Sequence, residues 1–145
     1  MAKTQYWIIK SEPHVYPYSQ LDEEKRTAWT GVRNFEARNN LRAMKPGDLA
    51  LYYHSGEGKE IVGVARIATE ATEDPTAPGE DWASVEVEPC VAFTRPVGLA
   101  EIKADPELAT FRLVTHSRLS VAQVSAEHFK HVLKLGKTKL PRPAR

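Results

Sequence analysis

The stretch YWIIKSEP, Tyr6–Pro13, is a run of aromatic and β-branched residues that ends in a proline. Such a run predicts a β-strand, and Pro13 holds the residue before it in an extended conformation, so the strand should pass into a loop there. Two further stretches have similar chemistry, WTGVRN at 29–34 and YYHS at 52–55. All three place aromatic rings beside hydrogen-bonding groups where a strand or helix begins or ends. They suit a pocket for a flat, polar, conjugated ligand, of which a nucleobase is the commonest.

Length and composition indicate one ordinary globular domain. The chain has 145 residues, 41% hydrophobic and 27% charged, as expected for a single soluble core. Its one cysteine, Cys90, lies in an apolar run without cationic neighbours, which favours a buried, reduced thiol. The sequence shows no signal-peptide core and no membrane-spanning run. We therefore expect a cytoplasmic protein and, without a long heptad or exposed apolar stripe, a monomer.

Charge is unevenly distributed although the net charge is only +1. Between Glu57 and Glu88 acidic residues outnumber basic ones by nine to two, whereas no acidic residue follows Glu127. Five basic residues also lie between 26 and 45. A dipolar molecule of this kind could turn a basic face to a phosphate backbone, or its charges could simply solvate the surface.

Hydrophobic periodicity and capping residues predict a mixed succession of elements. The expected strands cover 4–9, 49–54, 60–68 and 82–93, with a last one around Leu119. A bulge or edge position is expected at Pro89. The expected helices are a short one opened by Ser19 and running to about Lys25, then 35–44, 99–103 and a closing helix between Ser125 and Gly136.

These elements indicate an α+β fold. Five to six strands with short helices at both ends, in a chain this small, favour a strongly curved mixed sheet or barrel. We expect a single domain over residues 1–136, followed by a basic, proline-containing tail at 137–145 that should be flexible.

The ordered set of these stretches resembles the EVE domain, a member of the PUA-like superfamily that also contains the YTH and ASCH domains. Among eukaryotic proteins the chain is most similar to the thymocyte nuclear protein family. The matching stretches are YWIIKSEP at 6–13, WTGVRNFEARNNLRAMKPGD at 29–48, YYHS at 52–55, IVGVARI at 61–67, Asp74-Pro75 followed by Trp82, and RLSV at 118–121. They cover nearly the whole chain in order.

The resemblance implies a PUA-like curved mixed β-barrel with flanking helices and a pocket for one flipped-out nucleobase. Members of the family are implicated in reading modified bases, notably 5-methylcytosine-type marks in DNA, and related folds read modified RNA. It also implies a nucleic-acid partner, no catalytic activity and no cofactor. The loop at 69–82 is shorter here than in the eukaryotic relatives, a difference that bears on which base is preferred.

Reading an extruded base takes a flat face for stacking and polar groups at the base edge. Trp29 is the candidate stacking residue, with Tyr53 or Trp82 as a second wall and Gly31 allowing close backbone approach. A core role for Trp29 is equally consistent with the sequence. Glu12 is the candidate for the base edge, since a carboxylate accepts from an exocyclic amino group; an N-cap or a surface ion pair with Lys10 is its alternative. The other edge-reading candidates are Ser11 and the backbone near Val32.

Cationic and polar residues near the strand ends are candidates for holding phosphate. Lys10 and Arg33 are the first of these, and Arg118 and Ser120 could add contacts if they share one strand face. Plain surface exposure is the alternative for the latter two. For Asn34 a plain helix cap is favoured over contact with a ligand. Tyr53, His54 and Ser55 end a strand near the same region, but Tyr53 and His54 can both line a pocket only if a bulge or twist intervenes.

Two rival functions remain open at this point. A small nucleotide-processing enzyme could use Glu12 and His54 as an acid–base pair, although the chain has no phosphate-binding loop, nucleophile elbow or zinc-deaminase signature. The five histidines are too scattered to predict a metal site. A protein-interaction module could instead use the basic face formed by Arg38, Arg42 and the C-terminal tail.

Overall fold

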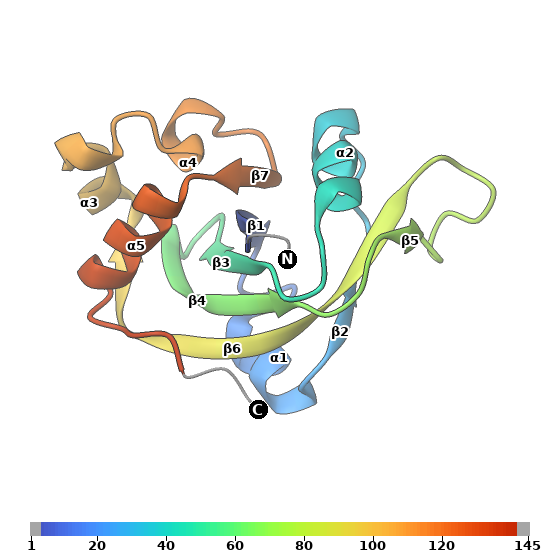
Figure 1. The fold of residues 1–145 in the computed structure, drawn as a ribbon, viewed down its shortest axis with the longest axis horizontal. Helices are drawn as coiled ribbons and strands as arrows, with labels where there is room; N and C mark the ends of the chain where they lie inside the picture. The colour runs from blue at the N-terminus through green and yellow to red at the C-terminus, as the bar shows by residue number, and fades with distance from the viewer. Residues whose placement is uncertain (1–3, 142–145) are drawn as a thin grey trace.

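The computed structural model describes residues 4–141 and shows one strongly curled sheet with short helices around it (Figure 1). Its strands are β1 (Tyr6–Ser11), β2 (Thr27–Trp29), β3 (Leu49–His54), β4 (Glu60–Ile67), β5 (Thr72–Glu73), β6 (Ala83–Gly98) and β7 (Val121–Val124). Its helices are α1 (Tyr18–Glu24), α2 (Phe35–Ala43), α3 (Leu99–Ala104), α4 (Arg112–Thr115) and α5 (Ala126–Leu135), with a 3₁₀ turn at Pro106–Leu108.

The strand order in this part of the chain is β2-β6-β4-β3-β1-β7, and β5 pairs with β6 beside that path. The pair β1 and β3 is parallel and the others are antiparallel, so the sheet is mixed. The register of β4 against β6 shifts where Ala65 faces Pro89, which confirms the bulge predicted at that proline. Such shifts bend a strand, and β6 curves along the whole sheet (Figure 1). The α+β class and the strongly curved mixed sheet are therefore confirmed.

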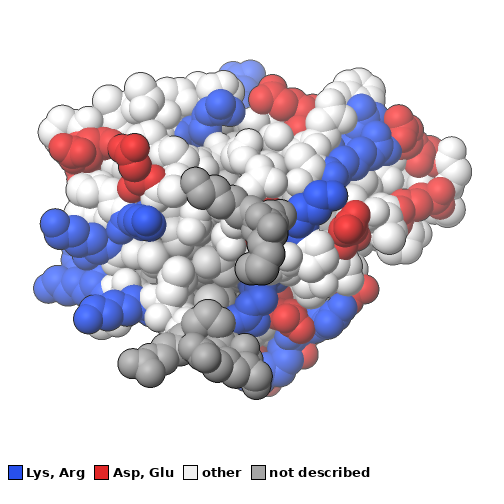
Figure 2. Space-filling model, viewed as in Figure 1, with Lys and Arg blue, Asp and Glu red and all other residues white. Residues whose placement is uncertain are grey.

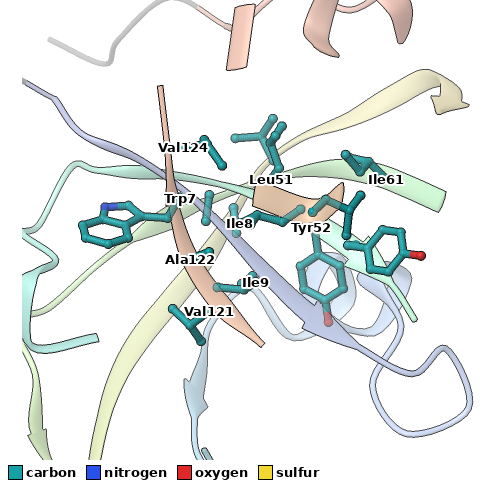
Figure 3. Packing of buried hydrophobic residues seen from close by; sticks show 14 of the residues in the cluster. Trp7, Ile8, Ile9, Leu51, Tyr52, Ile61, Val121, Ala122 and Val124 are labelled. Atoms are coloured by element: carbon teal, nitrogen blue, oxygen red, sulfur yellow. The ribbon is translucent and has the colours of Figure 1, made fainter. Parts of the chain in front are cut away.

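The core is built on β1, which lies between β3 and β7. Trp7, Ile8 and Ile9 are consecutive and all buried, because helices and the curled sheet cover both faces of this strand (Figure 3). Trp7 thus has the packing role that its strand position predicts, and its indole Nε1 donates to the buried carboxylate of Asp48 at 3.0 Å. The Asp48 carboxylate also accepts the backbone N–H of Lys45, which joins β1 to the turn before β3.

Two predicted helix caps are confirmed and one is wrong. The side chains of Asn34 and Ser125 accept from Ala37 N and His128 N at the starts of α2 and α5. Ser19 does not open α1; it lies inside that helix, which begins after Pro17.

The predictions around residues 19–30 and 113–124 were right only in part, because the signals there are short. The helix expected from Ser19 to about Lys25 is present as α1. Strand β2 spans three residues and was not predicted. The last strand begins at Val121, so Arg118 lies in the preceding turn and Ser120 just before the strand, and these two residues do not share a strand face.

The charge asymmetry seen in the sequence also appears on the surface. Basic side chains gather over the α5 end of the molecule and along α2, whereas acidic ones lie over the loop between β5 and β6 and over α3 (Figure 2). Beyond α5, the Thr138 hydroxyl accepts the Thr94 N–H of β6 at 2.8 Å. Tail residues 142–145 lie outside the described residues, so the flexibility expected there stays a prediction.

Candidate nucleic-acid interface

A cavity of about 410 Å³ lies where the two ends of the curled sheet approach each other. It is lined by residues 10–11, 15–16, 27–33 and 120. These come from the end of β1, the loop after it, β2 with its following loop, and the residue before β7. The backbone N–H of Lys10 donates to the carbonyl of Ser120 at 3.1 Å, which continues the pairing of β1 with β7 beyond Ile9 and Val121. The volume falls in the range of about 300–1,000 Å³ typical of small-ligand pockets.

Trp29 belongs both to the wall of this cavity and to the core. It is 8% exposed and stands edge-on to Tyr52, with ring centroids 5.5 Å apart, and to Tyr16, with centroids 6.3 Å apart. The hydroxyl of Tyr52 in turn donates to the carbonyl of Tyr16 at 2.6 Å. These contacts fix the indole, so the wall that Trp29 provides is rigid.

The loop after β2 is shaped by a glycine and held by a buried acid. Gly31 has φ +82°, a left-handed conformation that side chains other than glycine's rarely adopt. Its N–H donates to Asp74 Oδ2 at 2.9 Å, and the Arg33 guanidinium donates to the same oxygen at 3.1 Å. The other carboxylate oxygen accepts from the N–H and hydroxyl of Thr76. Asp74 therefore positions both Gly31 and Arg33 at the cavity.

The ionised form of Asp74 is strongly favoured. Burial by itself would raise the pKa of this carboxyl, but hydrogen bonds from Thr76, Gly31 and Arg33 outweigh it and hold the pKa well below its ordinary value. Sequence reasoning did not select Asp74 as a site residue. The available signal was an Asp followed by Pro and then Thr, a combination that often forms a side-chain-capped turn.

Lys10 is the cation at the β1 end of the cavity. Its ammonium donates to the Ser117 carbonyl at 3.0 Å and lies 6.0 Å from the centre of the Tyr53 ring. Burial lowers the pKa of this lysine. Ser11, the next residue, also lines the cavity.

The structure brings half of the predicted site residues together and places the others elsewhere. The residues that line the cavity are Lys10, Ser11, Trp29, Gly31, Val32, Arg33 and Ser120. The predicted residues outside its lining are Glu12, Asn34, Tyr53, His54, Ser55, Trp82 and Arg118.

The predicted residues outside the cavity lining that lie near β1, β3 and α2 make other contacts. The carboxylate of Glu12 is 3.2 Å from Nε2 of His14, and Asn34 is the cap of α2. The side chain of Tyr53 is buried in the core, and the N–H of Ser55 donates to the Ser11 carbonyl at 3.0 Å. A register shift does occur between Tyr52 and Tyr53, but it does not bring Tyr53 or His54 to the cavity.

His54 caps a helix instead of facing a ligand. Its Nε2 accepts the backbone N–H of Tyr18 at 3.1 Å, where the N-cap residue Pro17 offers no side-chain acceptor. An accepting Nε2 carries no proton, so the ring is neutral. Burial lowers the pKa of His54, and the Glu60 carboxylate offsets this only in part.

We expect His54 to make stability fall in mild acid. In the folded state His54 resists protonation, whereas the unfolded chain takes up the proton near the ordinary histidine pKa of about 6.5. The free energy of unfolding should thus decline as the pH falls from about 7, until the lowered folded-state pKa is passed. His54→Ala should cost about 1 kcal/mol at neutral pH, as loss of a helix cap does, and should flatten this decline. Urea unfolding between pH 7 and 5 measures both, with exposed His14→Ala as the control; an unchanged slope in His54→Ala would contradict the assignment.

Trp82 lies beside the cavity and not in its wall. Its ring is stacked on Phe35, with centroids 5.3 Å apart and planes 14° from parallel, and the Arg33 guanidinium lies 5.6 Å from its ring centre. Phe35, which sequence reasoning passed over, is 66% exposed. The signal was present: Phe35 lies off the buried Ala37, Leu41 and Met44 stripe of α2, so its ring had no place in the core.

No group of three or more potential metal ligands is found among residues 4–141. In the same range no helix has the length and apolar character required to span a bilayer.

The curled mixed half-barrel, with a cavity between its two edges, places the chain in the PUA-like class of domains. The EVE domain family model matches residues 5–135, and the chain belongs to that family. The YTH domain of Zygosaccharomyces rouxii, solved with N6-methyladenosine RNA, shares the fold at a TM-score of 0.60 and 20% identity.

Other proteins share more of their sequence with this chain. The Rhodopseudomonas palustris protein Rpa0253 is 46% identical with a TM-score of 0.88, and the match covers 92% of this chain and 94% of that one. Mouse thymocyte nuclear protein 1 is 34% identical, over 92% of this chain and 74% of the relative. Human THYN1, solved in complex with 5-methylcytosine-containing DNA, is 31% identical with a TM-score of 0.85, over 94% of this chain and 99% of that one.

Proposed function

We propose that this chain is a non-catalytic nucleic-acid-binding module that holds one flipped, modified base of the 5-methylcytosine type in the cavity beside Trp29. The observation that carries the proposal is the cavity itself, in which a rigid aromatic wall, hydroxyl groups and two cations converge. A solved relative of 31% identity, bound to 5-methylcytosine-containing DNA, supports the same class of ligand.

The lining residues divide into three roles. Trp29 supplies the flat face for stacking, at the end of the curled sheet. Ser11, Ser120 and the main chain of Val32 face the edge of the base, where hydroxyl and peptide groups can donate or accept. Lys10 and Arg33 flank the opening and hold phosphates. Glu12 has no part in this arrangement because its carboxylate is paired with His14 outside the lining.

The acid–base pair considered from the sequence, Glu12 and His54, does not face this cavity. In the described part of the chain, no carboxylate and no histidine lines the cavity, whereas that pair would need to reach one substrate atom together. Glu12 and His54 contact different partners and do not form a pair: the Glu12 carboxylate lies against His14, and His54 caps α1. The alternative of a protein-binding basic face at Arg38 and Arg42 predicts no displacement of a bound oligonucleotide by a free nucleoside, which the titration below tests. The cytoplasmic location and the monomeric state stay predictions.

Fluorescence polarisation tests the proposal. The protein is titrated into matched single-stranded and double-stranded DNA and RNA oligonucleotides, each with and without 5-methylcytosine or N6-methyladenine. We expect tighter binding to one modified base and displacement by the corresponding free nucleoside. Phosphate contacts alone would give salt-sensitive binding with no such preference, and that result would overturn the base pocket.

A further inference from the structure

Phe35 and Trp82 form an exposed aromatic pair beside the cavity. Phe35 is the first residue of α2, and the residue is 66% exposed although its ring stacks nearly parallel on Trp82. The core does not require this arrangement, because α2 buries its opposite face through Ala37 and Leu41. A large aromatic ring held rigid and open to solvent is typical of a surface that binds another flat group.

Guanidinium groups surround this pair. The guanidinium carbon of Arg38 is 5.0 Å from the Phe35 ring centre and 5.9 Å from that of Trp82, and Arg33 adds its group 5.6 Å from Trp82. Arg38 and Arg42 share one exposed carboxylate, Asp81, and Glu73 and Glu80 line the same groove beside Trp82. The Arg42–Asp81 pair is largely exposed, and such pairs contribute little to stability, so a phosphate can replace Asp81 at Arg42 at small cost. Figure 2 shows the basic side chains that gather along α2.

Arg33 makes this surface continuous with the cavity. It lines the cavity, bonds to Asp74, and extends its guanidinium over Trp82. A strand whose base enters the cavity would therefore carry its next phosphate and base toward Phe35. Unpaired bases stack on exposed aromatic rings whatever their identity, whereas arginines follow the phosphates.

We propose that Phe35 and Trp82, with Arg33 and Arg38, form a platform on which an unpaired nucleotide next to the cavity-bound base stacks. This inference rests on the proposed function, since it needs a nucleic-acid strand at the cavity. The platform contributes affinity for unpaired flanking sequence, and the cavity contributes the preference for the modified base.

The test uses short single-stranded DNA and RNA oligonucleotides with one 5-methylcytosine, or plain cytosine, flanked by the fluorescent base 2-aminopurine. Affinity and 2-aminopurine emission are measured for the wild type, Phe35→Ala, Phe35→Leu and Phe35→Trp, with Leu140→Ala as an exposed apolar control. We expect Phe35→Ala and Phe35→Leu to bind about tenfold more weakly, equally for methylated and plain strands, and to lose the emission change. Phe35→Trp should retain both. A duplex, whose flanking base is already stacked, should show a smaller loss.

The outcomes separate the platform from the base pocket. Wild-type affinity and emission in Phe35→Ala would overturn the platform, and would leave the base pocket standing if methylated strands are still preferred. Weaker binding by Phe35→Ala without any base preference in the wild type would support the platform and overturn the pocket. Retained binding by Phe35→Leu would overturn stacking as the cause. Absence of binding to every oligonucleotide would overturn both.

Discussion

Replacing Trp29 with alanine is expected to abolish the preference for a modified base and to leave weak, salt-sensitive binding. Stacking of one base on an aromatic side chain is worth about 1–3 kcal/mol, which corresponds to a loss of about five- to 150-fold in affinity for the preferred strand. Lys10 and Arg33 would still attract phosphates, so binding to plain strands should change little. Polarisation titrations at two salt concentrations measure both effects.

The same substitution should also lower stability, because Trp29 packs against Tyr52 and Tyr16. Removal of a buried tryptophan costs about 3–5 kcal/mol, so binding is measured well below the unfolding temperature, and folding is checked by circular dichroism. Trp7→Phe is the matched control, since Trp7 is buried in the core away from the cavity; it should lose stability and keep the base preference. Trp29→Phe should retain part of the preference. A folded Trp29→Ala protein that discriminates as the wild type does would remove Trp29 from the site.

Asp74→Ala should damage both the fold and the binding surface. The change leaves the N–H groups of Gly31 and Thr76 without their acceptor and releases Arg33. Each buried donor that loses its partner lowers the free energy of unfolding by about 1–3 kcal/mol. Because the loop around Gly31 can relax in part, we expect a total loss of about 3 kcal/mol. Affinity for oligonucleotides should fall as well, because Gly31 and Arg33 line the cavity.

Denaturant unfolding of the wild type and Asp74→Ala measures the loss in free energy of unfolding. The pH dependence of that loss tests whether the ionised Asp74 carboxylate is its cause. The Asp74 pKa is lowered by folding, so the carboxylate stabilises the protein fully above its ordinary value near 4. That contribution is lost as the pH falls below about 4 toward the folded-state pKa. The difference in stability between wild type and Asp74→Ala should therefore shrink in acid. Asp81→Ala, which removes an exposed acid, should change stability by only about 0.5 kcal/mol; an equal effect of the two variants would refute the role of Asp74.

Local chemistry made much of this fold predictable. The apolar run of β1, the cap at Asn34, the strand at β3 and the bulge at Pro89 each depend on neighbours within a few residues, and all are confirmed. The apolar/polar alternation read in β3 does not correspond to one buried face, because Ala50 to Tyr53 are all buried. Strand β2 and the start of α1 were missed because their signals are short and their partners distant. The three residues of β2 are held by pairing with β6, and α1 is capped by His54 from β3.

The sequence predicted which segments contribute to the site, but it did not predict the contacts between their side chains. The sequence by itself determined the EVE family, the curled α+β architecture and the aromatic and polar segments near the cavity, because periodicity and motif order are properties of the chain. Only the tertiary structure decided that Asp74 holds Gly31 and Arg33, that His54 is used as a helix cap, and that Trp82 stacks on Phe35. These contacts join residues far apart along the chain, and the curl of the sheet, which sets them, arises from the pairing of all its strands together.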